Sequence, residues 1–274
     1  MCYFACAIHL KGKPVTAMQF ISDLVARGRY CFSTEEATDA LGTTAVATRA
    51  ALRRLRQKDE LAMPSRGFYV VVPPEFRNAG CLPAGHFIPA LMEHLGEKYY
   101  AGLLSAAEYH GAAHQRPQIF QVMVARNKPE ITCGKVRVMF VARKNVAQIP
   151  TADFKTPRGY LKISTPAATA FDLVGYPNHA AGLDNVATIL AELAEHLDGE
   201  ELIRLAALSP IAWAQRLGYL LELVGAQKKT AKLAKFISEK NPEPTPLTPS
   251  RPFEGISQLK PWNILVNTLV EADI

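Results

Sequence analysis

The segment Ser33–Val72 constrains the fold of this chain more than any other. It predicts a short helix over Thr34–Leu41 with Thr34 as its cap, a second helix from Thr44 to about Lys58, and two β-type runs flanking Pro64–Gly67. A hydroxyl side chain can cap a helix start, and glycine, here Gly42, readily takes the left-handed conformation that ends a helix. A short helix, a tight turn, a second helix and a β-ribbon in this order are typical of a winged helix-turn-helix.

The second predicted helix has an apolar side and a basic side. Its large apolar residues are Val46, Leu52 and Leu55, of which Leu52 and Leu55 share one face with Ala45, Thr48 and Ala51. Its opposite side carries Arg49, Arg53, Arg54 and Gln57. At roughly 1.5 Å per residue the helix spans about 22 Å, which is enough to lie along a major groove. An arginine cluster alone is more often a solvated face, but the flanking helix, turn and ribbon favour DNA binding, with Arg66 at the ribbon tip near phosphate or the minor groove.

The length of the chain suggests the number of its domains, and its charge suggests the kind of partner that it binds. The 274 residues suggest two domains, which we place at 1–76 and 81–274, since the Pro- and Gly-rich stretch after Pro73–Pro74 is the best boundary. With 49% hydrophobic and 20% charged residues, the bulk of the chain is globular. A net charge of +6 and a pI near 9.0 favour an anionic partner, either nucleic acid or an acidic protein.

Beyond the first 76 residues the patterns alternate between helix and strand. Helices are expected over 86–95 and 100–110, followed by strands 118–126 and 135–143 as a hairpin and a third strand over 159–163. A helix capped by Thr165 should start at Pro166 and reach Val174, and further helices should run to Lys240. The Pro-rich segment 242–252 should be extended, and 261–266 should pack back onto the body. The expected class is α+β, a winged helix-turn-helix followed by a larger mixed α/β domain with a helical C-terminal half.

The cysteines and the apolar start of the chain bear on location. Five scattered cysteines without a C-x-x-C pair indicate reduced thiols in a cytoplasm. The apolar run Cys2–Leu10 is too short to span a membrane, and its lysines follow it, unlike those of a secretory signal. We therefore predict a soluble cytoplasmic protein without a membrane partner.

Motifs for catalysis or cofactor binding are missing from the sequence. No glycine spacing matches a phosphate-binding loop, and both central strands lack the Asp and Glu that a metal nuclease needs. His110 and His114 are four apart, but no third metal ligand is evident. We predict no cofactor, no metal and no enzymatic activity. The basic helix Lys228–Lys240 is open to two interpretations, a solvated face or a second electropositive surface.

Several segments together resemble one known family. They are the winged segment ending GFYVV, then YYAGLLSAAEYHG, the predicted hairpin, ISTPAATAFDLV, QRLGYLLELVG and KPWNILVNTLVEADI. In this order they resemble the AbiEi family, the antitoxin and autorepressor half of bacterial AbiE-type (type IV) toxin-antitoxin operons. The resemblance implies a winged-helix DNA-binding domain and a C-terminal antitoxin domain. It also implies repression through repeats in the chain's own promoter, and an action against a nucleotidyltransferase-type toxin without a tight complex.

The resemblance also implies which residues contact double-stranded DNA. They are Thr43, Thr44, Arg49, Arg53, Arg54 and Arg66. Ala167–Ala168 stands where a Glu-Arg pair is expected in relatives, which puts a charge-dependent role of that helix in doubt. Two copies are expected on an inverted repeat, while the sequence leaves open whether a homodimer forms in solution. The alternative is a protein-interaction antitoxin or adaptor that acts through its C-terminal domain and lacks sequence-specific DNA binding.

Overall fold

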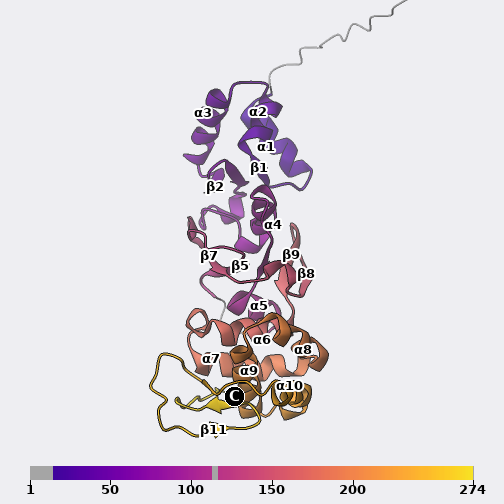
Figure 1. Cartoon of the computed structure of the whole chain (residues 1–274). Helices are drawn as coiled ribbons and strands as arrows, with labels where there is room; N and C mark the ends of the chain where they lie inside the picture. The colour runs from indigo at the N-terminus through magenta and orange to yellow at the C-terminus, as the bar shows by residue number, and fades with distance from the viewer. Residues whose placement is uncertain (1–14, 113–116, 274) are drawn as a thin grey trace, which may run out of the picture. The chain divides into compact units, whose positions relative to one another are not determined.

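The chain forms two compact units in a computed structural model that describes residues 15–112 and 117–273 (Figure 1). The first unit runs to Leu95 and includes Ile131–Val136, and the second comprises Gly96–Glu130 and the chain from Arg137 onward. The first unit thus continues past residue 76 through another helix. The division into a DNA-binding part over 1–76 and an antitoxin part over 81–274 stays a prediction.

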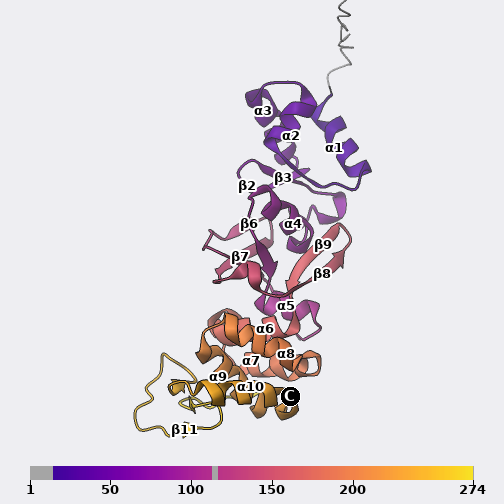
Figure 2. The same cartoon turned by 45° about the vertical axis from the view of Figure 1, so that its right-hand side comes forward.

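The first unit contains a winged helix-turn-helix. Its elements are α1 (Ala17–Ala26), β1 (Cys31–Ser33), α2 (Thr34–Leu41), α3 (Ala45–Arg56), β2 (Leu61–Ser65), β3 (Phe68–Val71), η1 (Pro74–Phe76), α4 (Ala84–His94) and β6 (Ile131–Cys133). The three strands β1, β3 and β2 form an antiparallel sheet in that order, so the ribbon gains a third strand, β1, that the sequence did not predict. Figure 2 shows α1, α2 and α3 grouped together. The α+β class with an N-terminal winged helix-turn-helix is confirmed.

The core of this unit explains why its three helices form. Phe20, Ile21 and Leu24 of α1 and Leu52 and Leu55 of α3 are buried in one cluster with the wing strands. Spacings of three and four residues place each set on one helix face, where burial of each side chain contributes about 1.5–3 kcal/mol.

The start of α2 differs from the prediction. Ser33, not Thr34, is the N-cap, since its Oγ accepts a hydrogen bond from the N–H of Glu36. Thr34 is already helical, and its hydroxyl instead donates to the carbonyl of Gly67. Both residue types can cap a helix, and the pairing of Ser33 with Phe68 in the wing sheet fixes which of the two keeps an extended backbone.

The second unit is built on a mixed sheet with helices packed after it. Its strands are β4 (Tyr99–Ala101), β5 (Phe120–Val124), β7 (Val136–Ala142), β8 (Thr151–Thr156) and β9 (Gly159–Ser164), in the spatial order β7-β5-β4-β9-β8. Its helices are α5 (Leu103–Tyr109), α6 (Pro166–Gly175), α7 (Leu183–Leu193), α8 (Gly199–Leu208), α9 (Ile211–Leu223) and α10 (Gln227–Lys240), with short 3-10 turns η2 (Val146–Gln148), η3 (Pro177–Ala180) and η4 (Ala194–His196). The predicted helical C-terminal half is confirmed, and so is Thr165 as the cap of α6.

Two predictions in this unit, one on strand pairing and one on a helix start, were wrong. β5 and β7 are parallel, with Phe120 opposite Val138, and so do not form a hairpin. Parallel strands need a longer connection than a hairpin turn. Here the connecting segment includes β6, which belongs to the first unit. The helix predicted over 100–110 starts only at Leu103, because Tyr99–Ala101 forms the strand β4 between β5 and β9.

The last segment of the chain packs back onto the helices of the second unit, as predicted. Trp262 is fully buried in the same core as α9, and short strands β10 (Thr245–Pro246), β11 (Gln258–Leu259) and β12 (Ile264–Leu265) form a small sheet beside it. In the described parts of the chain, no helix is both long and apolar enough to cross a membrane. The apolar start Cys2–Leu10 lies outside the described residues.

Candidate nucleic-acid interface

The turn between α2 and α3 has the geometry that the motif requires. Gly42 follows α2 with φ +58°, a left-handed conformation that glycine adopts without the steric cost of a side chain. Thr44 caps α3, its Oγ1 accepting a hydrogen bond from the N–H of Ala47. Only Gly42, Thr43 and Thr44 separate the two helices, so α3 is set firmly against α2.

One side of α3 is fixed in the core, and this determines which side faces solvent. Thr48, Leu52 and Leu55 are the buried residues of the helix. At about 100° per residue, Arg49 and Arg53 lie about 40° apart on the other side, while Arg54 is about 100° further round than Arg53. Arg49 and Arg53 therefore belong to one face and Arg54 to its flank.

All six residues predicted to contact DNA are exposed. These are Thr43, Thr44, Arg49, Arg53, Arg54 and Arg66. Arg54 Nε donates a long hydrogen bond of 3.4 Å to the carbonyl of Ala50 in the same helix. Within the described ranges, no ion pair or hydrogen bond engages the side chains of Arg49, Arg53 or Arg66. Their guanidinium groups are thus available to an external anion.

The charge of this region is unbalanced. From Gly42 to Lys58 the chain has five cationic side chains and no Asp or Glu. Because no carboxylate on α3 neutralises these cations, positive charge is concentrated on this helix.

The wing tip is held by the first helix of the motif. Arg66–Gly67 forms a two-residue loop between Ser65 and Phe68, and Gly67 has φ +81°. The Gly67 carbonyl accepts hydrogen bonds from both the N–H of Thr34, at 2.8 Å, and its hydroxyl, at 3.3 Å. The position of Arg66 is therefore tied to the start of α2.

One large apolar residue of α3 lies on the exposed face. Val46 is 70% exposed, on the same side of α3 as Arg49 and Arg53. Val46 precedes Arg49 by three residues and Arg53 by seven. These spacings place the three side chains on one helix face, so the sequence could have indicated that Val46 is exposed. An exposed branched aliphatic side chain beside arginines is suited to contact a thymine methyl group.

The second unit holds a buried charged cluster that sequence inspection missed. Arg143 Nε lies 2.9 Å from Asp172 Oδ1, and Tyr100 donates a hydrogen bond of 2.9 Å to Asp172 Oδ2. Burial raises the pKa of Asp172 to about 6, against the opposing effects of the Arg143 charge and the Tyr100 hydrogen bond. Arg143 also stacks on Trp213 and donates to Ser209 Oγ. The cluster is almost fully inaccessible to solvent, and its contacts connect Asp172 of α6 with Tyr100 of β4 and Arg143 at the end of β7.

Of the histidine pair considered as a metal site, only His110 lies within the described residues. His110 Nε2 lies 2.7 Å from the Ser164 carbonyl oxygen, and burial lowers its pKa. His114 lies outside the described residues. Among the residues that the structure describes, no group of three or more His, Cys, Asp and Glu side chains could hold a metal ion.

Comparison with known families identifies both units. Residues 19–72 match the model "Transcriptional regulator, AbiEi antitoxin", and residues 100–223 match "AbiEi antitoxin C-terminal domain". The chain belongs to the AbiEi antitoxin family. It is thus an antitoxin with a regulatory role, and neither family description is that of an enzyme.

Solved structures were also compared with the fold of this AbiEi chain. The RV2827C protein from Mycobacterium tuberculosis is similar over 90% of each chain, with a TM-score of 0.66 and 20% identity. The antibiotic-resistance factor ANT(2'')-Ia matches 45% of this chain and 87% of its own, at a TM-score of 0.31 and 10% identity, which is too low to bear on the fold. No curated protein matches the chain.

Proposed function

We propose that this AbiEi protein represses its own operon by inserting α3 into the major groove of double-stranded DNA at promoter repeats. The observation that carries the proposal is the exposed face of α3, which is free of carboxylates and rich in arginine, within a winged helix-turn-helix. Arg49 and Arg53 are the proposed base-reading residues, since arginine can donate two hydrogen bonds to a guanine edge. Each such pair discriminates by about 1–3 kcal/mol against a wrong base.

The remaining predicted residues are assigned to the DNA backbone. Thr43 and Thr44 lie at the N-terminal end of α3, where hydroxyl and N–H groups suit a phosphate. Arg54 on the flank of the helix and Arg66 on the wing are proposed to neutralise phosphates. Each neutralised phosphate adds about 0.9 to the slope of log affinity against log salt concentration, so these two residues should govern salt sensitivity more than sequence preference.

The second unit is the proposed antitoxin part, acting against a nucleotidyltransferase-type toxin. Support for an antitoxin role comes from the description of the model that matches residues 100–223. Two copies on an inverted repeat are expected, because paired half-sites are usual for this motif. Repression of an operon requires access to chromosomal DNA, so the predicted cytoplasmic location goes with this proposal.

A gel-shift titration with DNA from the chain's own upstream region tests the DNA-binding role. Arg53→Ala and Arg49→Ala should each weaken binding by about tenfold or more, while Arg204→Ala, an exposed arginine on α8 in the second unit, should leave affinity unchanged. If both α3 variants bound as tightly as the wild type, α3 would not be the reading helix. If the wild type bound no upstream DNA at low salt but co-purified with the neighbouring gene product, an adaptor role would replace the proposal.

Growth rescue separates the two roles. The full-length double variant Arg49→Ala/Arg53→Ala should still rescue cells that express the neighbouring toxin gene, because its second unit is unaltered. Loss of rescue by a variant that is folded and present at wild-type levels would mean that toxin neutralisation depends on DNA binding.

A further inference from the structure

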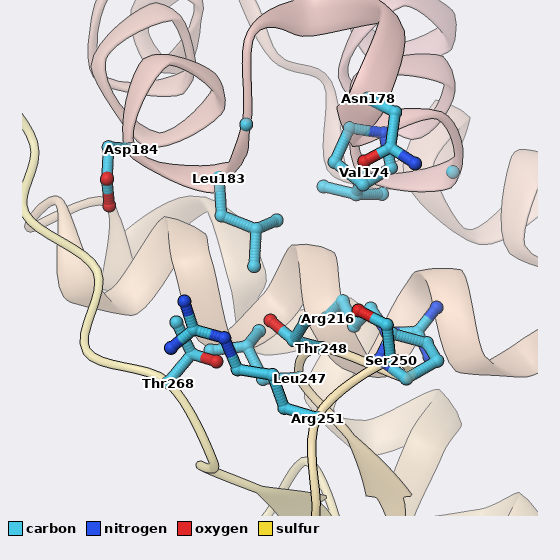
Figure 3. Close-up of a pocket in the computed structure, with 14 residues that line it drawn as sticks. Val174, Asn178, Leu183, Asp184, Arg216, Leu247, Thr248, Ser250, Arg251 and Thr268 are labelled. Carbon is cyan, nitrogen blue, oxygen red and sulfur yellow. The ribbon is translucent and has the colours of Figure 1, made fainter.

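The second unit contains a half-open cavity that the DNA-binding role does not use. It has a volume of about 450 Å³ and lies between the α6–α7 connection, helix α9 and the segment 247–251. Figure 3 shows Asn178, Leu183 and Asp184 on one side of it, with Arg216, Thr248 and Arg251 on the other. Cavities of 300–1,000 Å³ are the usual size for small-molecule sites.

Arg216 is the unusual residue of this cavity. It is half-buried, and burial lowers its pKa. Its Nε donates to the Pro246 carbonyl at 3.1 Å, but no Asp or Glu in the described chain pairs with its guanidinium. Burying part of a cation without a counter-charge costs free energy. The two terminal nitrogens of an arginine form a fork that matches two oxygens of a carboxylate or phosphate. Arg216 therefore offers two unused nitrogen donors to a ligand.

Other groups around the cavity add to its preference for an anion. Arg251, an exposed residue of the segment 247–251, is a second arginine in the lining without an acidic partner in the described chain. Helix α7 starts at the cavity, with Gly182 as an N-cap that has no side chain to satisfy the first N–H groups. The one carboxylate in the lining, Asp184, accepts a hydrogen bond from the N–H of Glu271. The cavity thus has two cationic groups and a positive helix end against one engaged carboxylate.

Part of the lining is apolar. Leu183 and Pro177 are partly exposed and give the cavity an apolar surface, while Val174 and Leu247 are buried in the wall behind it. Inorganic phosphate would leave this surface in contact with water, whereas a ligand with a flat organic body would cover it. From these features we propose that the cavity binds a small organic phosphate of nucleoside monophosphate size, its phosphoryl group held by Arg216 and Arg251 and its body against Leu183 and Pro177.

Calorimetric titration of the full chain tests the site with three probes at constant ionic strength, namely AMP, ribose 5-phosphate and inorganic phosphate. The wild type should bind at least one of the two organic phosphates saturably and more tightly than inorganic phosphate. Arg251→Gln and Arg216→Lys should each raise the dissociation constant by about tenfold or more, because each loses a charge-assisted contact. The matched control Arg204→Gln should change it less than twofold.

Three results would overturn the proposal. One is no saturable binding of any probe at millimolar concentration, and another is binding that both Arg251→Gln and Arg216→Lys leave unchanged. The third is equal affinity for all three probes, which would indicate an adventitious ion only. Arg251 is exposed, so its variant keeps the test valid even if Arg216→Lys fails to fold. The Arg49→Ala/Arg53→Ala variant should bind AMP as the wild type does, which separates this site from the proposed DNA-binding role.

Discussion

Removing the Arg143 charge from the buried Arg143–Asp172 pair should destabilise the second unit strongly. Arg143 is 3% exposed and Asp172 is fully buried, so neither charge can be compensated by water. Breaking a buried pair of this kind costs about 3–5 kcal/mol, because the remaining charge stays in the core. We expect Arg143→Met to lower the free energy of unfolding by this amount at pH 8. Asp172→Asn should lower it much less, because the amide resembles the protonated carboxyl that burial favours.

The pH dependence distinguishes the two variants. The pKa of Asp172 is about 6 in the fold against an ordinary value of 3.8. Its carboxyl therefore favours folding most below pH 3.8, and this contribution is lost as the pH rises through about 6. Without the Arg143 charge the pKa of Asp172 rises further. Arg143→Met should thus regain stability as the pH falls from 8 to 5, whereas Asp172→Asn should regain none from this site.

Tryptophan fluorescence follows this unfolding selectively. The chain's two tryptophans, Trp213 and Trp262, both belong to the second unit, and Trp213 lies against Arg143. Urea titrations monitored at these residues give the free energies, and the double variant Arg143→Met/Asp172→Asn should cost less than the sum of the single variants. A cost of Arg143→Met below about 1 kcal/mol at pH 8, or identical pH profiles for the two variants, would refute the reasoning.

Three further predictions concern packing and thiol chemistry. Leu52→Ala, at a fully buried position of α3, should destabilise the winged unit by about 2–5 kcal/mol, as hydrogen exchange of α3 amides would measure. Gly218→Ala should lower the melting temperature and shift the emission of Trp262, because a Cβ there would overlap the Trp262 ring. Cys81 donates a hydrogen bond to Cys133, which lowers the pKa of Cys133. Cys81→Ala should therefore slow alkylation of Cys133 at pH 7, measured by mass spectrometry, and an unchanged rate would argue against this hydrogen bond.

Local signals made much of the fold predictable. The cap at Thr165 followed by Pro166 defines the start of α6 because both act within one helical turn. The spacing of Leu52 and Leu55 identifies the buried side of α3, and with it the exposed arginines, for the same reason. The exposed arginines could thus be identified before the structure was known, while their contact with DNA stays a prediction. The exposure of Val46 was not predicted, because hydrophobicity alone does not say which residues a small unit buries.

Long-range pairing could not be predicted in this way. The parallel arrangement of β5 and β7 depends on a chain excursion through β6, and no residue pattern in the strands encodes it. Arg143 and Asp172 come from a strand end and a helix, and their contact depends on how α6 packs against the sheet. Cys81 and Cys133 are likewise brought together by tertiary structure, where Gly80 and Gly134 allow their two segments to approach closely.

The most direct test of the central claim is the specificity of DNA binding. Fluorescence anisotropy would compare the chain's own upstream repeat with a scrambled duplex of equal composition, at one fixed salt concentration, for the wild type and Arg53→Ala. The wild type should prefer the repeat by about 10³-fold or more, and Arg53→Ala should lose about tenfold or more of that preference while binding the scrambled duplex with only a modest loss. A wild-type chain that bound both duplexes equally, or an Arg53→Ala variant with undiminished preference, would contradict the account.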